Sequence, residues 1–132
     1  MIIKKTIHIA TTKQFQLFPI TKQVEQALAE SGIKEGLVSL FVPHTTGGVR
    51  VNENKAQLHQ DILKSFYNLV PLDTPYSHAA NSHAHLKAFL IGSSENIPIS
   101  GGKLQLGAHQ NIFFIEFDGG RQRSIEVTLI GE

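Results

Sequence analysis

Histidine is the residue type with the most chemical potential in this chain, which has seven histidines among 132 residues. His44 follows an apolar run and precedes a Thr-Thr-Gly-Gly turn, a pattern typical of ligand sites at strand ends. Three more histidines fall within residues 78–85. Because neutral imidazoles bind zinc and transfer protons near neutral pH, His44, His78 and His85 could supply three nitrogens to one metal ion if their segments meet. At each of these positions, the alternative is a histidine with a purely structural role.

A helix is expected to carry His83 and His85, and its geometry limits what the two can do together. A spacing of two residues turns a helix by about 200°, so the two side chains should point to different sides and should not share a metal ion. We expect His85 to face inward with Ala88 and Phe89, and His83 to be more exposed.

Glu53 lies in the sequence Asn-Glu-Asn between an expected strand and an expected helix. A carboxylate there could stabilise the helix start, orient a ligating histidine or act as a general base. Stabilising the helix start is the most frequent of these roles, and the sequence leaves all three open.

Several polar groups are suited to holding an anion. Ser93 and Ser94 follow a glycine, Lys87 is close to them in sequence, and Arg121 and Arg123 flank the last turn. Arginine side chains and backbone amides are the usual phosphate ligands in proteins. The two arginines face the same side if that stretch is extended. A solvated turn is the alternative, and it is the more frequent one.

Composition excludes several classes of function. Twelve Lys and Arg against eleven Asp and Glu give a net charge of +1, which argues against a nucleic-acid binder that acts through bulk charge. The absence of cysteine excludes a disulfide scaffold, a thiolate zinc site and a cysteine nucleophile. Lys4 and Lys5 interrupt the N-terminal apolar residues, so no signal peptide is expected, and no apolar run reaches the ~20 residues of a membrane span. We therefore expect a cytoplasmic protein without a membrane partner.

Hydrophobic periodicity predicts an α+β fold. Strands are expected at 2–10, 15–19, 36–42, 97–99, 112–117 and 124–130, with alternation also resuming at 49–51. Helices are expected at 21–31, capped by Thr21, at 54–68, and from a cap at Asn81 or Ser82 to a stop at Gly92. Gly101-Gly102 and the stretch 118–121 are expected to form hairpin turns, and Pro98 to weaken an edge-like strand. The sum is one domain over residues 1–132, an antiparallel-rich mixed sheet with two or three inserted helices.

These segments together resemble the YjbQ family, whose members are also described as secondary thiamine-phosphate synthase enzymes. The resemblance runs in order along nearly the whole chain with similar spacings. It rests on residues 41–48 (FVPHTTGG), 52–54 (NEN), His78, 81–88 (NSHAHLKA), 90–94 (LIGSS), Gly107, Gln110, 116–119 (EFDG), Arg121 and 129–132 (LIGE).

The resemblance implies a compact α+β domain that assembles as a homotrimer, with a metal site built from His44, His78 and His85. The ion would be divalent, and zinc is the default for imidazole ligands. We assign catalytic roles to Glu53, His85 and Lys87. Contacts to a phosphorylated small-molecule substrate are assigned to six polar residues: Thr45, Thr46, Asn81, Ser93, Ser94 and Arg121.

The chain departs from the usual pattern of the family at three positions. His83 stands where an acidic residue often occurs, His109 where an aromatic residue is common, and Gly120 where proline is frequent. The missing acid puts the charge and the metal preference of the site in question.

Three functions are compatible with these residues. The first is a metal-dependent enzyme on phosphorylated small molecules, with thiamine-phosphate synthesis as the case that the resemblance implies. That reaction joins a pyrimidine methyl diphosphate to a thiazole phosphate with loss of pyrophosphate. The second is a metal-dependent hydrolase with Glu53 as general base, and the third is a non-catalytic, ligand-binding trimer. A domain of this size has little room for an enclosed site, so we expect the pocket at a subunit interface.

Overall fold

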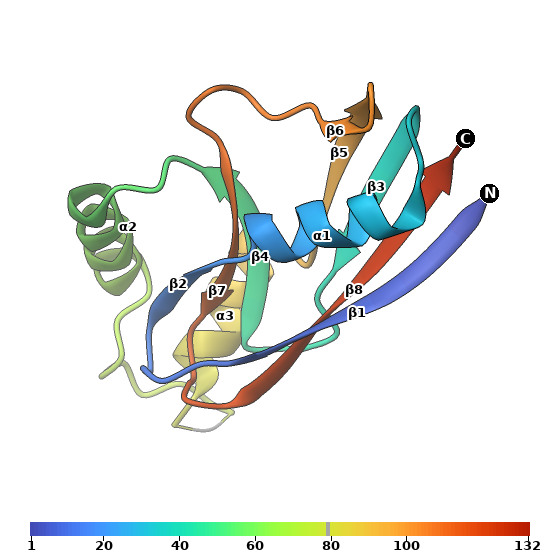
Figure 1. Ribbon diagram of the computed structural model, residues 1–132. Coiled ribbons are helices and arrows are strands. Elements are labelled where there is room, and N and C mark those ends of the chain that lie inside the picture. The colour runs from blue at the N-terminus through green and yellow to red at the C-terminus, as the bar shows by residue number, and fades with distance from the viewer. Residues whose placement is uncertain (79) are drawn as a thin grey trace.

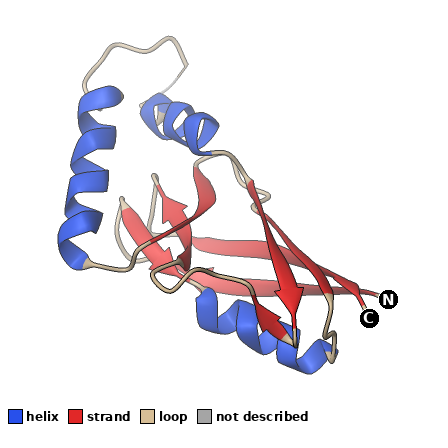
Figure 2. Cartoon of the chain, turned by 90° about the horizontal axis from the view of Figure 1, so that it is seen from above, coloured by secondary structure: helices blue, strands red, loops and turns tan. Residues whose placement is uncertain are grey.

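The computed structural model describes residues 1–78 and 80–132, which form eight strands in two antiparallel sheets and three helices (Figures 1 and 2). The five-stranded sheet has the spatial order β1 (Ile2–Ala10), β8 (Gln122–Gly131), β3 (Gly36–Phe41), β5 (Ser94–Ser100) and β6 (Lys103–Leu104). The three-stranded sheet has the order β2 (Gln16–Pro19), β7 (Asn111–Glu116) and β4 (Gly47–Asn52). The helices are α1 (Thr21–Ser31), α2 (Ala56–Leu69) and α3 (Ser82–Ile91). The predicted α+β class is confirmed, and the strands lie in two antiparallel sheets where one antiparallel-rich mixed sheet was expected.

The main core lies between α1 and the five-stranded sheet. Alternation along β8 buries every second residue, including Ile125, and β1 buries Ile7 and Ile9 on the same side. Helix α1 places Val24 and Leu28 against that face. The α1 ribbon lies across these strands in Figure 1. Helix α1 ends where expected, because Gly32 adopts a left-handed conformation with φ of 74°.

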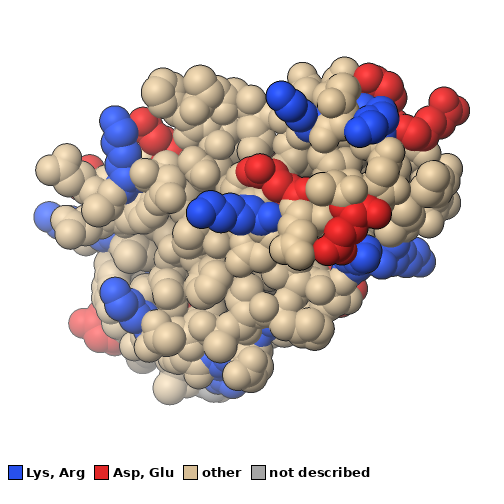
Figure 3. All heavy atoms as spheres, in the orientation of Figure 1, with Lys and Arg blue, Asp and Glu red and all other residues tan. Residues whose placement is uncertain are grey.

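A smaller core joins α3 to the three-stranded sheet. Ala84, Ala88 and Ile91 of α3 pack with Phe113 and Ile115 of β7. Helix α2 is different, since none of its residues is fully buried. The face seen in Figure 3 carries interspersed basic and acidic side chains. Among the described residues, the helices are all too short or too polar to span a bilayer.

The predicted cap of α1 is wrong, whereas that of α3 is right in its position but makes no side-chain cap bond. Ile20, not Thr21, occupies the N-cap of α1, and the Thr21 hydroxyl instead accepts the Ile112 N–H at 2.9 Å, which ties the helix to β7. Asn81 occupies the N-cap of α3, but its amide nitrogen donates to Asp118 at 3.3 Å and makes no cap bond. Both polar side chains thus serve tertiary contacts in place of local ones.

The stretch 118–121 is not a hairpin turn, because β7 and β8 belong to different sheets. Its backbone pairs instead with the segment that follows β1. Thr11 N–H donates to the Arg121 carbonyl at 2.9 Å, and Gly119 N–H donates to the Gln14 carbonyl at 3.1 Å. These non-local hydrogen bonds fix the path of the chain where it passes from one sheet to the other.

Strand β5 is longer than predicted and is not an edge strand. It spans seven residues between β3 and β6, although only Ile99 and Ser100 pair with β6. A proline at position 98 is tolerated beside so short a neighbouring strand. Gly101 and Gly102 form the predicted hairpin turn, with φ of 59° and 73°.

Candidate functional site

The candidate site lies where the chain passes between the two sheets. Residues 42–46 join β3 to β4, and residues 117–121 join β7 to β8, so both crossings connect one sheet to the other. The N-terminal part of α3 lies beside them. Two adjoining hollows of about 320 and 390 Å³ share His44, Thr45 and His85 in their walls. We call this pair of hollows the histidine cavity.

The histidine cavity contains many of the residues that the sequence singles out. The first hollow is lined by His44, Thr45, Thr46, Asn81, His85 and Arg121, together with Pro43, Asp118 and Arg123. The second adds Ser93 and the apolar side chain of Phe89. Three segments that are distant in sequence therefore converge on one cavity.

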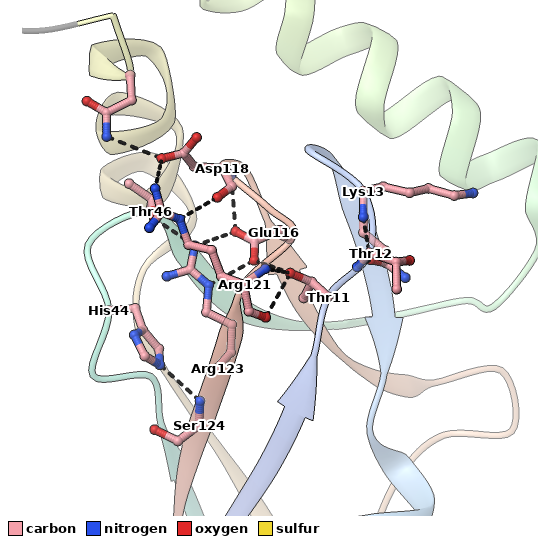
Figure 4. Close-up of polar contacts among 12 residues, drawn as sticks. Thr11, Thr12, Lys13, His44, Thr46, Glu116, Asp118, Arg121, Arg123 and Ser124 are labelled. Carbon is pink, nitrogen blue, oxygen red and sulfur yellow. Dashed lines mark hydrogen bonds and ion pairs between the residues drawn. The ribbon is translucent and has the colours of Figure 1, made fainter.

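His44 is half-buried and uses one of its ring nitrogens within the fold. Its Nε2 accepts the backbone N–H of Ser124 at 3.0 Å (Figure 4). Burial lowers the pKa of His44, and the nearby Arg123 guanidinium lowers it further. The ring is therefore neutral at pH 7 with its proton on Nδ1, which makes that atom a hydrogen-bond donor.

Arg123 and Glu116 form a buried ion pair in the wall of the cavity. The Arg123 Nε donates to Glu116 Oε1 at 2.8 Å, its Nη2 contacts Oε2, and Nη2 also donates to the Thr46 hydroxyl at 2.7 Å. The Thr11 hydroxyl donates to Glu116 at 2.7 Å, as Figure 4 shows. Burial alone would raise the pKa of Glu116, but the hydrogen bonds from Arg123 and Thr11 outweigh it and hold the pKa below 4.5.

A second, more exposed pair borders the first. Arg121 Nη2 contacts Asp118 Oδ2 at 3.0 Å, and its Nε donates to the Asp118 carbonyl at 2.7 Å. Burial would raise the pKa of Asp118, yet the hydrogen bonds from Asn81 and Arg121 keep it below 3.8. Asp118 thus remains ionised and holds both the α3 N-terminus and Arg121 in position.

His78 and His85 lie against each other, edge to face, with ring centroids 5.2 Å apart. His78 is exposed and does not line the hollows, whereas His85 lines both. Within residues 1–78 and 80–132 of one chain, no three His, Asp or Glu side chains are grouped so that they could hold a metal ion. The structure therefore pairs His85 with His78 and, in the cavity, with His44, without a three-ligand cluster.

Lys87 lies outside the histidine cavity, fully buried among rings. Its Nζ is 3.1 Å from His83 Nδ1, and it lies 4.8 Å from the centroid of Phe15 and 5.2 Å from that of Tyr67. Burial lowers the pKa of Lys87, and burial followed by the Lys87 charge lowers that of His83.

The expected faces of α3 are wrong. His83 is only 2% exposed, whereas Phe89 is 89% exposed, the reverse of the prediction. The apolar residues of α3 itself are distributed all round the helix, so their spacing alone did not identify which face would be buried. The buried face carries His83 and Lys87, one turn apart.

Two other assigned residues also lie elsewhere. Glu53 lines a separate pocket, where it contacts Lys55 at 3.2 Å and His109 at 3.6 Å. Ser94 is exposed at the start of β5 and does not line the cavity. The structure does not bring either residue together with His44 within one chain.

Sequence reasoning missed two charged residues of the site, Glu116 and Asp118, and it considered Arg123 for anion binding without predicting its ion pair. A signal was present for the pair of Arg123 and Glu116. Arg123 lies two residues before Ile125 and therefore on the same, buried face of β8. Glu116 ends the apolar run of β7. Charged residues at buried positions are almost always paired, so each predicts a partner for the other.

Comparison with known proteins gives consistent matches over the length of the chain. The family described as UPF0047 protein YjbQ-like matches residues 5–132. The chain is 41% identical over 126 residues to a UPF0047 protein of Methanocaldococcus jannaschii, covering 94% of this chain and 91% of that one. It is 36% identical over 130 residues to the UPF0047 protein YugU of Bacillus subtilis, covering 96% and 98%.

Solved structures are similar to this chain over nearly its whole length. A YbjQ-like protein of unknown function from Sulfolobus solfataricus has a TM-score of 0.97 with this chain at 38% identity, covering 100% of this chain and 99% of that one. A YjbQ/UPF0047 protein of Clostridium acetobutylicum has a TM-score of 0.93 at 42% identity, covering 96% and 99%.

Proposed function

The chain belongs to the YjbQ-like UPF0047 family, and we propose that it is an enzyme that acts on phosphorylated small molecules in the histidine cavity. The observation that carries this proposal is that His44, His85 and Arg121 line one cavity although they come from three distant segments. Imidazoles transfer protons near neutral pH, and guanidinium groups bind phosphate oxygens. A cavity with both groups has the components for acid–base chemistry on a phosphorylated compound.

Arg121 is the group that we propose to hold a phosphate. Its side chain is 55% exposed and makes two bonds to Asp118, one to the carboxylate and one to the carbonyl. A guanidinium has five N–H donors, so donors remain for phosphate oxygens. Arg123, by contrast, is occupied by Glu116 and Thr46, and its role would be to shape the wall and to contribute positive charge.

His44 is the group that we propose to hold a phosphate oxygen by a hydrogen bond. Ser124 N–H fixes its Nε2, so Nδ1–H would donate to that oxygen. The lowered pKa of His44 keeps the ring neutral at pH 7, so Nδ1 keeps its proton and acts as a hydrogen-bond donor. His85, which lines both hollows, is the imidazole that we propose to transfer the proton.

Thiamine-phosphate synthesis is the named reaction within this proposal. A pyrimidine methyl diphosphate joins a thiazole phosphate, and pyrophosphate leaves. The two hollows, of about 320 and 390 Å³, lie in the range of small-molecule sites. One hollow is polar around Arg121, and the other includes Phe89 and Ala88, which suits a phosphate end and a ring end.

As an alternative to proton transfer by His85, we propose that His78 and His85 hold a divalent ion, zinc by default. Their rings are adjacent, and both are imidazoles, which zinc prefers. His44 fits less well as a third ligand, because Nε2 is already bonded to Ser124 N–H. A neighbouring copy of the chain is the proposed source of the remaining donors. When bound, the ion would neutralise charge on a departing diphosphate.

The homotrimer is proposed on the exposed apolar face of α3. Leu86, Phe89 and Leu90 are 44%, 89% and 57% exposed, and Phe89 also lines the histidine cavity. A group of large exposed apolar side chains on one helix face is typical of a surface that a partner covers. Burial of this face by a second copy would close the cavity from outside.

The hydrolase alternative gains no support from Glu53. Its carboxylate lies in the wall of a separate pocket and contacts Lys55 and His109. A general base must lie within hydrogen-bond reach of the water that it activates. Glu53 does not line the cavity of His44 and His85 within one chain.

The direct test is formation of thiamine phosphate from its two precursors by purified protein. We expect product with the wild type, and His85→Ala or His44→Asn should reduce the rate by about 10²-fold or more, the range for loss of a general acid or base or of a hydrogen-bond donor to the transition state. His8→Ala is the matched control, because His8 is exposed on β1 and should leave the rate unchanged. Wild-type turnover no higher than that of His85→Ala would remove the synthase proposal.

Metal content is tested separately from activity. Protein purified without chelator should contain zinc or another divalent ion. The double variant with His78→Ala and His85→Ala should contain no such ion. If chelation lowers the melting temperature but no precursor is ever turned over, the non-catalytic trimer becomes the better description. Equal metal content in wild type and double variant would contradict the proposed ligands.

A further inference from the structure

A second pocket lies between α2 and the three-stranded sheet. It has a volume of about 230 Å³, and its apolar wall consists of Leu17, Ile62, Phe66, Ile91, Phe113 and Ile115. We call it the α2 pocket. Because no residue of α2 is fully buried, the helix does not fill the space above the sheet. Figure 2 shows α2 at the side of the strands, connected by a loop at each end.

His59 places a polar atom in this apolar surrounding. Its ring packs edge to face against Phe113, with centroids 5.1 Å apart, and the residue lines the α2 pocket. The Nε2 atom is buried and has no hydrogen-bond partner among the described residues. Buried side-chain nitrogens nearly always have a partner, so an isolated one within a pocket wall indicates a position where a ligand atom would be bound.

From these contacts we infer that the α2 pocket binds a small neutral aromatic compound with one hydroxyl group, whose oxygen pairs with His59 Nε2. A hydroxyl can donate or accept, so it matches either tautomer of the ring. The rings of Phe66 and Phe113 in the wall suit contact with a single aromatic ring.

Volume and charge narrow the ligand class. An apolar cavity of about 150 Å³ in another protein holds benzene, so 230 Å³ accommodates one ring with a substituent. The charged residues at the rim are already paired, Arg50 with Glu95 at 2.8 Å and Glu53 with Lys55 at 3.2 Å. Since these rim charges are of opposite sign and each has a partner, they do not select for an ion.

The α2 pocket is independent of the proposed function. Among the described residues, those that line it are not those that line the histidine cavity. Failure of one proposal therefore leaves the other unaffected.

Phenol is the probe, with toluene as the analogue that lacks the hydroxyl. We expect saturable chemical-shift changes at the Phe113 and Ile115 amides when phenol is titrated into the full-length protein. His59→Leu should weaken phenol binding by about fivefold, the effect of one net hydrogen bond, and should leave toluene binding unchanged. His8→Leu is the matched control and should change neither affinity.

A blocking variant supplies a second test. Ile62→Trp places a larger side chain in the pocket and should abolish binding of both compounds. Three results would overturn the inference: no saturable shift at these amides in the wild type, equal effects of His59→Leu on phenol and toluene, or undiminished binding in a folded Ile62→Trp variant. The ratio of phenol to toluene affinity in His59→Leu remains decisive even if Ile62→Trp does not fold.

Discussion

The guanidinium of Arg123 lies against the carboxylate of Glu116, with Nε donating to Oε1 at 2.8 Å, where β8 begins and β7 ends. The two strands belong to different sheets, so this buried pair joins the sheets at the wall of the histidine cavity. Arg123→Met would leave the Glu116 carboxylate buried without its cation. We expect a loss of about 3–5 kcal/mol in the free energy of unfolding, measured by urea denaturation.

Arg121→Met is the control for Arg123→Met, since it removes the same charge two residues earlier. The Arg121–Asp118 pair is more exposed, so the expected loss is at most about 1 kcal/mol. Equal losses for the two variants would show that burial of the Glu116 pair has no special energetic effect.

The lowered pKa of Glu116 predicts an acid-dependent loss of stability. Because the folded pKa lies below the ordinary value of 4.5, the unfolded state binds more protons between the two values. The contribution of the ionised Glu116 to the free energy of unfolding is therefore complete above pH 4.5. It is lost as the pH falls through the pKa that Glu116 has in the folded state. Urea denaturation at a series of acidic pH values should show a steeper decline for the wild type than for the Glu116→Gln, Arg123→Met double variant.

Glu126→Gln provides the comparison for that acid series, because Glu126 is an exposed acid on β8. Its decline with pH should follow that of the wild type. A double variant that loses stability with acid as steeply as the wild type would contradict a role for Glu116.

Part of the fold was predictable because the signal is local. Alternation in β1 and β8 identified the strands, since alternate residues of β8 and of the second half of β1 meet the same core. Gly32 marked the end of α1 because a left-handed residue is needed there. The hairpin at 118–121 was wrongly predicted because a glycine pair between two strands looks the same whether or not the strands pair. The conformation of this stretch is set by backbone hydrogen bonds to Thr11 and Gln14, which are distant in sequence.

The candidate site was predictable in part for a related reason. The motif around His44 and the motif around His85 each had a recognisable sequence, and both line the histidine cavity. The direction of Lys87 could not be predicted, since apolar residues occur all round α3 and either face could have packed inward. Glu116 and Arg123 lie on separate strands, and only the crossing between sheets makes them partners.

Burial of Lys87 predicts stability that rises with pH. Its folded pKa lies below the ordinary 10.5, so the unfolded state binds more protons between the two values. The destabilisation is complete below the folded pKa and disappears as the pH rises through 10.5. Lys87→Met keeps contact with the rings of Phe15 and Tyr67, so it should be more stable than the wild type at pH 7, with a difference that narrows towards pH 10.5.

Urea denaturation in the presence of a chelator measures this difference without contribution from a metal ion. Lys64→Met is the matched control, because Lys64 is exposed on α2. Its effect should be small and should not change with pH. A Lys87→Met variant that is less stable than the wild type at pH 7 would mean that the charged amine stabilises the fold through the rings around it.

The exposed Phe89 predicts how the chain assembles. If a second copy covers α3, light scattering at micromolar concentration should give the mass of a trimer for the wild type. Phe89→Glu would place a charge in that apolar interface, and we expect it to give a monomer with an unchanged far-ultraviolet circular dichroism spectrum. Leu69→Glu introduces the same charge at a residue of α2 that is 67% exposed, and it should remain trimeric. A monomeric wild type, or a trimeric Phe89→Glu variant, would remove α3 as the assembly surface and with it the proposed supply of metal ligands from a neighbouring copy.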